Sequence, residues 1–132
     1  VVGVDIDADA RRLARAEVLL ADLPNCSLRQ GEMGSLPFAD ATFDTVILDD
    51  VLKGADDSVK ALREAQRLLR RGGRILLLAA VRDSDATEIK KQFSQYAAAA
   101  GLRLASPRSI PGRSPAWLLA VATPAERASA AA

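Results

Sequence analysis

Short apolar runs alternate with amphipathic stretches along this chain. The runs at residues 43–49 and 74–81 have the length of β-strands, and the second is apolar on both faces, as in strands buried within parallel sheets. The stretch between them carries apolar residues at helical spacing, at Val59, Leu62, Ala65 and Leu69. Along the whole chain, the pattern predicts strands at residues 1–5, 26–30, 43–49, 74–81, 102–106 and 117–123.

Three helices are predicted between these strands, at about residues 8–23, 56–71 and 85–100. Asp7 is well placed to cap the first helix, in which Ala10, Leu13, Ala14 and Leu20 lie roughly on one apolar face. Gly72 and Gly73 are expected to end the second helix as a glycine cap.

The alternation of strands and helices predicts an α/β fold with a mostly parallel sheet. No helix separates the last two strands, so they are expected to pair antiparallel at one edge. We expect one domain over residues 1–124, followed by a flexible tail rich in Ala and Ser at 125–132.

Composition removes several classes of protein. The 132 residues are 49% hydrophobic with a net charge of +1, which excludes a disordered chain and gives no general attraction to nucleic acid. The absence of histidine excludes Ser–His nucleophile pairs and His-ligated metals. The single Cys26 excludes an internal disulfide and fits a reducing compartment, so we expect a cytoplasmic protein. No apolar run approaches the roughly 20 residues that span a bilayer.

Acidic residues follow three of the predicted strands. Ligands of open α/β sheets bind beyond the carboxyl ends of the strands, where Asp5, Glu32 with Met33, and Asp49 with Asp50 stand. A carboxylate at the position of Asp5 commonly accepts hydrogen bonds from both hydroxyls of a ribose. Glu32 is placed to accept from the exocyclic amine of a base. The alternative for each is a turn, capping or solvent-exposed acid.

Three segments carry a resemblance to a known family. They are Val-Gly-Val-Asp-Ile-Asp at 2–7, Gly-Glu-x-x-x-Leu-Pro-Phe-Ala-Asp-x-x-Phe-Asp at 31–44, and Leu-Leu-Arg-Arg-Gly-Gly-Arg-Ile-Leu at 68–76. Together they resemble class I S-adenosylmethionine-dependent methyltransferases, in particular the small-molecule type related to ubiquinone biosynthesis. A weaker similarity, at residues 25–31, is to methyltransferase domains fused behind an ArsR-type winged-helix regulator.

The resemblance implies a Rossmann-like sheet and S-adenosylmethionine as cofactor. By this resemblance Asp5 holds the cofactor ribose and Ile6 packs on the adenine. Glu32 takes the place of the usual Asp that accepts from the adenine amine. Met33 supplies a backbone contact and a soft wall to the ring.

The resemblance also places Asp49 and Asp50 at the strand end that faces the methyl donor and the acceptor. Asp49 is thus a cofactor contact, and either acid is a candidate general base or an anchor for a cationic acceptor. Metal-dependent relatives carry Asp-Asn after the next strand, where this chain has Ala-Ala-Val at 79–81, so no metal site is expected.

One part of the family pattern is missing. The glycine-rich loop under the methionine part of the cofactor, and the central strand before it, have no counterpart here. The resemblance places that strand between the strands at 1–5 and 43–49. We therefore expect an N-terminally truncated fragment, inactive without a preceding segment. Its sheet should keep a gap, or close by direct pairing or with a partner chain.

Three functions remain open at this stage. The first is the C-terminal part of a methyltransferase that acts on a small molecule. The second is a methyltransferase-like sensing domain of an ArsR-type transcriptional regulator, with nucleic acid contacted only by the fused domain. The third is another nucleotide-binding α/β protein, such as a dehydrogenase domain. A homodimer is left open, and no membrane partner is expected.

Overall fold

The computed structural model describes residues 1–52, 54–82, 86–110 and 116–125 and contains two compact units, Val1–Pro37 and Phe38–Ala132. Most of the predicted tail at 125–132 lies outside the described residues, and so does the predicted start of the third helix at 85. The prediction of one domain over 1–124 stays a prediction. No helix in the described ranges has the length and apolar character needed to cross a bilayer.

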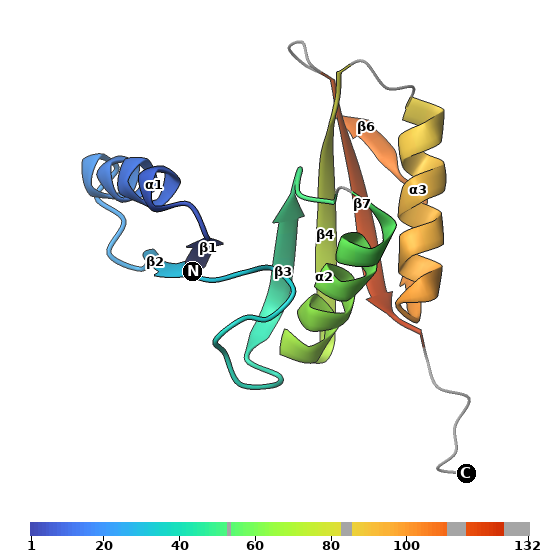
Figure 1. Ribbon diagram of the computed structural model, residues 1–132, viewed down its shortest axis with the longest axis horizontal. Coiled ribbons are helices and arrows are strands. Elements are labelled where there is room, and N and C mark those ends of the chain that lie inside the picture. Colours follow the sequence, from blue (N-terminus) through green and yellow to red (C-terminus); the bar gives the residue numbers. More distant parts are fainter. Residues whose placement is uncertain (53, 83–85, 111–115, 126–132) are drawn as a thin grey trace. The chain divides into compact units, whose positions relative to one another are not determined.

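The first unit is a two-stranded parallel sheet with one helix (Figure 1). Its elements are β1 (Val2–Asp5), α1 (Ala8–Leu20) and β2 (Ser27–Gln30). Asp7 caps α1 as predicted, because its side chain accepts a hydrogen bond from the Asp9 backbone N–H. Of the predicted apolar face, Ala10 and Ala14 are half-buried, whereas Leu13 and Leu20 are 71% and 83% exposed. Two strands are too narrow to cover more than the Ala14 and Val18 stripe of the helix.

The second unit is a five-stranded sheet with two helices. Its elements are β3 (Phe43–Asp49), α2 (Ala55–Leu68), β4 (Leu69–Val81), α3 (Ala86–Ala99), β5 (Leu102–Leu104), β6 (Arg108–Ile110) and β7 (Ala116–Pro124). The strand order is β3-β4-β7-β5, and β6 also pairs with β7. β3 and β4 are parallel, whereas β7 is antiparallel to β4, β5 and β6.

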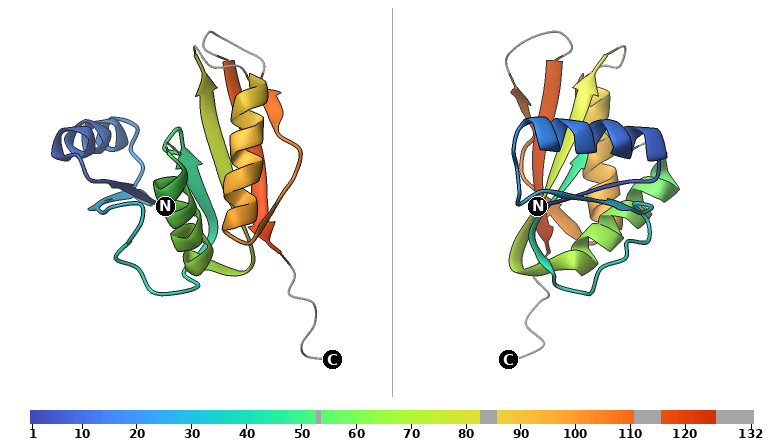
Figure 2. Two further views of the ribbon diagram at one scale, coloured as in Figure 1. Left: turned by 45° about the vertical axis from the view of Figure 1, so that its right-hand side comes forward. Right: turned by 90° about the vertical axis from the view of Figure 1, so that its left-hand side faces the viewer.

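Both helices of the second unit lie against one face of this sheet (Figures 1 and 2). The apolar core forms there because alternate residues of β4 and β7 point toward the helices. Its fully buried members include Leu62, Leu68, Ile75, Leu77 and Leu118. This burial fixes the register in which β3 and β4 pair.

The predicted glycine cap of the second helix is wrong. α2 ends at Leu68, and Leu69 is already extended, buried and paired with Phe43 as the first residue of β4. Gly72 adopts a positive φ of 81° inside the irregular start of that strand. Sheet pairing of a buried leucine therefore ends the helix before the glycines are reached.

The predicted α/β class, with an antiparallel strand at the C-terminal edge, is confirmed. β6 was missed because it is short, fully exposed and set among prolines, so it lacks an apolar alternation. The described strands form two sheets, in which β1 pairs with β2 and β3 pairs with β4; how the gap in the sheet closes stays a prediction.

Candidate functional site

The turn after β1 presents the carboxylate of Asp5. Asp5 is exposed, and its Oδ1 accepts a hydrogen bond of 2.9 Å from the Asp7 backbone N–H. Arg11 Nη1, one turn into α1, donates to the carbonyl oxygens of Asp5 (2.8 Å) and Ile6 (2.9 Å). The turn is thus restrained by the Asp7 N–H and by the Arg11 guanidinium, while Asp5 Oδ2 accepts no hydrogen bond from the described residues.

Ile6 and Glu32 extend this edge of the first unit. Ile6 is 64% exposed beside Asp5. Because β1 and β2 are parallel and Asp5 lies opposite Gln30, Asp5 and Glu32 both lie at the carboxyl ends of these two strands. Glu32 is exposed, and Met33 after it is half-buried. Four of the five residues predicted for cofactor binding therefore lie in the first unit, whereas the fifth, Asp49, lies in the second.

Gly31 allows the loop after β2 to run close to β1. A Cβ at this position would lie 2.6 Å from Val4 Cγ1, well inside van der Waals contact. A larger residue would push the loop away from β1 and move Glu32 from the edge that carries Asp5. The glycine in the Gly-Glu motif thus serves close packing.

Asp49 and Asp50 stand at the carboxyl end of β3 in the second unit, beside the end of the parallel strand β4. Asp49 is exposed, and its carboxylate forms no hydrogen bond or ion pair with the described residues. Asp50 is half-buried, and its carboxylate accepts from the Ala80 N–H and pairs with Arg82. The two neighbouring acids therefore differ in what they are free to bind.

The loop that follows the first unit is anchored by Arg67 on α2. Arg67 donates to the Phe38 carbonyl oxygen (2.8 Å), to Asp40 (2.7 Å) and to Glu64. The hydrogen bonds to Glu64 and then Asp40 raise the pKa of Arg67 above its ordinary value. The Leu-Pro-Phe-Ala-Asp motif thus contains two of the groups that this guanidinium holds.

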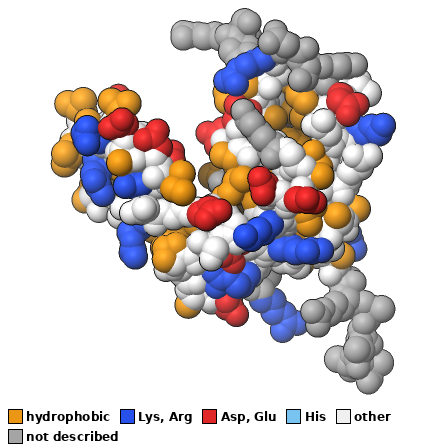
Figure 3. All heavy atoms as spheres, in the orientation of Figure 1, with side chains coloured by type: hydrophobic (Ala, Val, Ile, Leu, Met, Phe, Trp, Pro, Cys, Tyr) orange, Lys and Arg blue, Asp and Glu red, His pale blue; other side chains and the backbone are white. Residues whose placement is uncertain are grey.

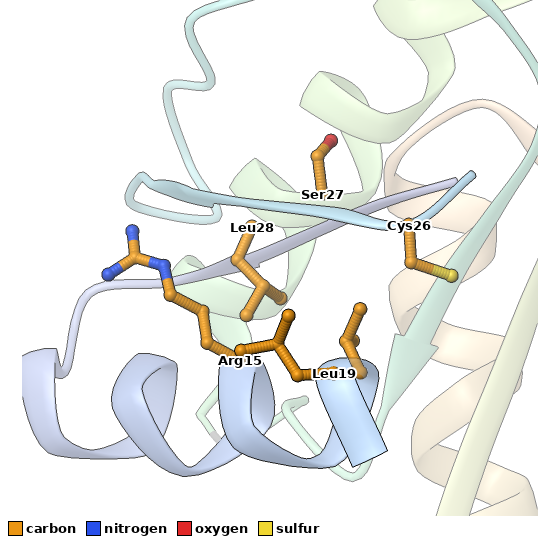
Figure 4. Close-up of a pocket in the computed structure, with 6 residues that line it drawn as sticks. Arg15, Leu19, Cys26, Ser27 and Leu28 are labelled. Atoms are coloured by element: carbon orange, nitrogen blue, oxygen red, sulfur yellow. The ribbon is translucent and has the colours of Figure 1, made fainter. Parts of the chain in front are cut away.

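A shallow apolar pocket of about 260 Å³ lies between α1 and β2. It is lined by Arg15, Val18, Leu19, Cys26, Ser27 and Leu28. Leu28 points from β2 toward the helix (Figure 4). None of the predicted site residues lines this pocket. Within the described ranges there is also no cluster of three or more acidic or Cys side chains able to hold a metal ion.

Residues 1–77 match a protein family described as "Methyltransferase domain". The match covers more than half of the 132 residues. The chain belongs to this methyltransferase family. It is 36% identical over 75 residues to demethylmenaquinone methyltransferase of Listeria monocytogenes, covering 57% of this chain and 32% of that protein. The chain therefore spans about a third of the length of that curated relative.

Several solved structures share the fold. The PH0226 protein from Pyrococcus horikoshii has a TM-score of 0.73 at 19% identity, covering 95% of this chain and 71% of its own. An O-methyltransferase from neocarzinostatin biosynthesis, solved with S-adenosyl-L-homocysteine and 1,4-dihydroxy-2-naphthoic acid, also has a TM-score of 0.73 at 19% identity. There the match covers 94% of this chain and 42% of that one.

These findings confirm the predicted resemblance to class I S-adenosylmethionine-dependent methyltransferases and their Rossmann-like fold. S-adenosylmethionine is the methyl donor of that class. The ArsR-type fusion and the roles of single residues stay predictions. Two residues were missed, Arg11 and Arg82, which bind Asp5 and Asp50 in the structure. The signal for Arg11 was its place one turn into the helix that follows Asp5.

Proposed function

We propose that this chain is part of an S-adenosylmethionine-dependent methyltransferase that acts on a small molecule. The nucleoside part of the cofactor is held at the carboxyl ends of β1 and β2. The observation that carries the proposal is the turn at Asp5, whose backbone carbonyl oxygen accepts from Arg11. Its exposed carboxylate accepts from the Asp7 N–H and keeps the other oxygen unbonded within the described residues. The family match over residues 1–77 supports it.

The side chains at this edge fit a nucleoside. A carboxylate with an unused oxygen can accept from the vicinal hydroxyls of a ribose. Ile6 offers an exposed aliphatic surface on which an adenine ring can pack. Glu32 can accept from the exocyclic amine of the base, and Met33 adds a polarizable side chain beside it. When bound, S-adenosylmethionine supplies a methyl group on a sulfonium sulfur.

The protein's part in methyl transfer is to orient the acceptor and remove its proton. A hydroxyl or amine acceptor loses a proton as its oxygen or nitrogen takes the methyl group, and a carboxylate within hydrogen-bond reach can receive that proton. Asp49 and Asp50 are the proposed groups at the end of β3, either as base or as anchor for a cationic acceptor. Asp49 is also the proposed contact to the methionine part of the cofactor.

The proposal includes an additional N-terminal segment that supplies a glycine-rich loop and a strand. Support comes first from the open edges of β1 and β3 in the described residues. β3 is an edge strand whose Ile47 is 57% exposed and which lacks the lysines and prolines that usually protect an edge. A two-stranded sheet such as β1–β2 is marginal by itself.

Further support comes from apolar surface that has no cover in the described structure. Leu13, Leu19 and Leu20 of α1 are 71–83% exposed, and apolar side chains are visible on the surface of that unit (Figure 3). Burying one such side chain stabilises a protein by about 1.5–3 kcal/mol. An additional strand and helix would bury this surface and satisfy the open strand edges, so we expect the chain by itself to be inactive.

The test is a calorimetric titration of S-adenosylmethionine into a longer protein that carries its natural preceding segment. We expect Asp5→Ala to weaken binding about 10–100-fold, as for loss of charged hydrogen bonds. Asp9→Ala is the matched control, since Asp9 is an exposed acid in the same region that pairs with Arg12. Equal affinity of the Asp5→Ala variant and the unmodified protein would remove Asp5 from the site.

The same titration into the 132-residue chain tests the need for the additional segment. Binding as tight as in the longer protein would refute that need. The sensing domain of an ArsR-type regulator, the alternative from the sequence, differs in its chemistry: it would bind a small molecule without forming S-adenosylhomocysteine. Measuring that product with candidate acceptors separates the two functions.

A further inference from the structure

Asp50 joins the ends of β3 and β4 through three contacts. Its backbone N–H donates to the Leu78 carbonyl (2.7 Å), and its Oδ1 accepts from the Ala80 N–H (3.1 Å). Its Oδ2 lies 3.4 Å from Arg82 Nη1. The first two contacts fall on alternate residues of β4, whose backbone groups point to the same side of the strand, and the third is with the side chain of Arg82, just after β4. The regular pairing of β3 with β4 ends at Asp49 and Leu78. Beyond this pair, the Asp50 carboxylate accepts the hydrogen bond from the β4 backbone that a further residue of β3 would otherwise accept.

The backbone of Asp50 is fitted to this task. Its φ of 55° lies in the left-handed region, which Asp adopts more readily than most residues because its short side chain bonds locally. The side chain is 25% exposed, against 59% for Arg82. The less exposed bond to the Ala80 N–H is therefore the stronger restraint, because an exposed ion pair contributes little.

We propose that Asp50 is a positioning residue that holds the carboxyl ends of β3 and β4 together, while Asp49 is the acid that contacts the acceptor. This assignment rests on the proposed function. Both oxygens of Asp50 are engaged, whereas the Asp49 carboxylate has no bond to the described residues. Asp50 thus restrains the carboxyl ends of the two strands, and Asp49 contacts the ligand.

The first experiment reads the restraint itself, by amide hydrogen exchange measured with NMR on the 132-residue chain. Asp50→Ala is expected to speed exchange at Ala80 on the order of 10-fold, since the amide loses its acceptor. Asp50→Asn keeps an oxygen at Oδ1 and should preserve the protection. Asp44→Ala, an acid near the other end of β3, is the control and should leave Ala80 unchanged. Unchanged exchange in Asp50→Ala would overturn the proposal.

The second experiment measures S-adenosylhomocysteine formation by the longer protein, with 1,4-dihydroxy-2-naphthoic acid as the acceptor probe. We expect Asp50→Ala to lower kcat on the order of 10-fold or more without changing cofactor affinity, and Asp50→Asn to recover most of that loss. Asp49→Asn should lower kcat with Ala80 exchange unchanged. If Asp50→Asn is as slow as Asp50→Ala, Asp50 acts chemically and the proposal is wrong.

A failure of the proposed function would be seen separately, as absence of cofactor binding to the unmodified protein. In that case the acceptor role of Asp49 is refuted as well. The restraint by Asp50 is then decided by the exchange experiment alone.

Discussion

Ser58 offers a test of how the second unit is packed. It lies in the first turns of α2, is fully buried, and its hydroxyl has no hydrogen-bond partner among the described residues. A buried polar group without a partner costs about 1–3 kcal/mol of stability. Ser58→Ala removes that cost, so the variant should be more stable than the unmodified protein.

The size of the effect follows from three contributions. Removing the unpaired hydroxyl gains about 1–3 kcal/mol. Alanine in place of serine in a helix gains up to about 0.5 kcal/mol. The void left by one oxygen, roughly 12 Å³, costs about 0.3 kcal/mol. We therefore expect the free energy of unfolding to rise by about 1–3 kcal/mol.

Urea unfolding followed by fluorescence is the assay, because the single tryptophan, Trp117, lies in β7 of the same unit. With a urea slope of about 1–3 kcal/mol per molar, the midpoint should rise by at least about 0.3 M. The control is Ser94→Ala, whose exposed hydroxyl donates to the Lys90 carbonyl and should matter little. A lower midpoint for Ser58→Ala would mean that its hydroxyl has a favourable partner, and the reasoning would be refuted.

Two other predictions concern the start of β4 and the loop before β3. Gly73→Ala should lower the free energy of unfolding by about 1–3 kcal/mol, because its Cβ would lie 2.8 and 2.9 Å from two backbone carbonyl oxygens. Gly72→Ala meets no atom within 4 Å, but the φ of 81° strains an alanine there, so this variant should also lose about 1 kcal/mol; urea midpoints measure both effects. Arg67→Met should speed chymotrypsin cleavage after Phe38, whose carbonyl loses its donor. Arg70→Met, which breaks only an exposed pair, should cleave at the unmodified rate, and equal rates for all three proteins would contradict the anchoring role of Arg67.

Local patterns predicted most of the elements because they depend on neighbouring residues. Phe43–Asp49 has the bounds expected from its apolar run, and Asp7 caps α1 as its position indicated. The predictions failed where distant residues decide. Leu69 leaves the helix to pair with Phe43, a partner far away in the chain that no helical spacing can indicate. Leu13 and Leu20 fit a helix face, yet the two strands beside α1 are too few to cover them.

The candidate site divides in the same way. Knowing that ligands bind at the carboxyl ends of strands was enough to select the acids at those ends. It did not distinguish Asp49 from Asp50, because the difference arises from contacts with Ala80 and Arg82 on another strand.

By itself, the sequence determined the order of strands and helices apart from the short strand β6, and the residue types available at the ends of the strands. Only the tertiary structure decided which strand pairs with which within each unit, and which acid is restrained by the described residues and which is not. The physical reason is that strand pairing and side-chain capping join residues distant along the chain. The free energy of these interactions depends on which backbone N–H and C=O groups have no partner within their own strand or helix. The local periodicity of the sequence does not indicate which groups these are.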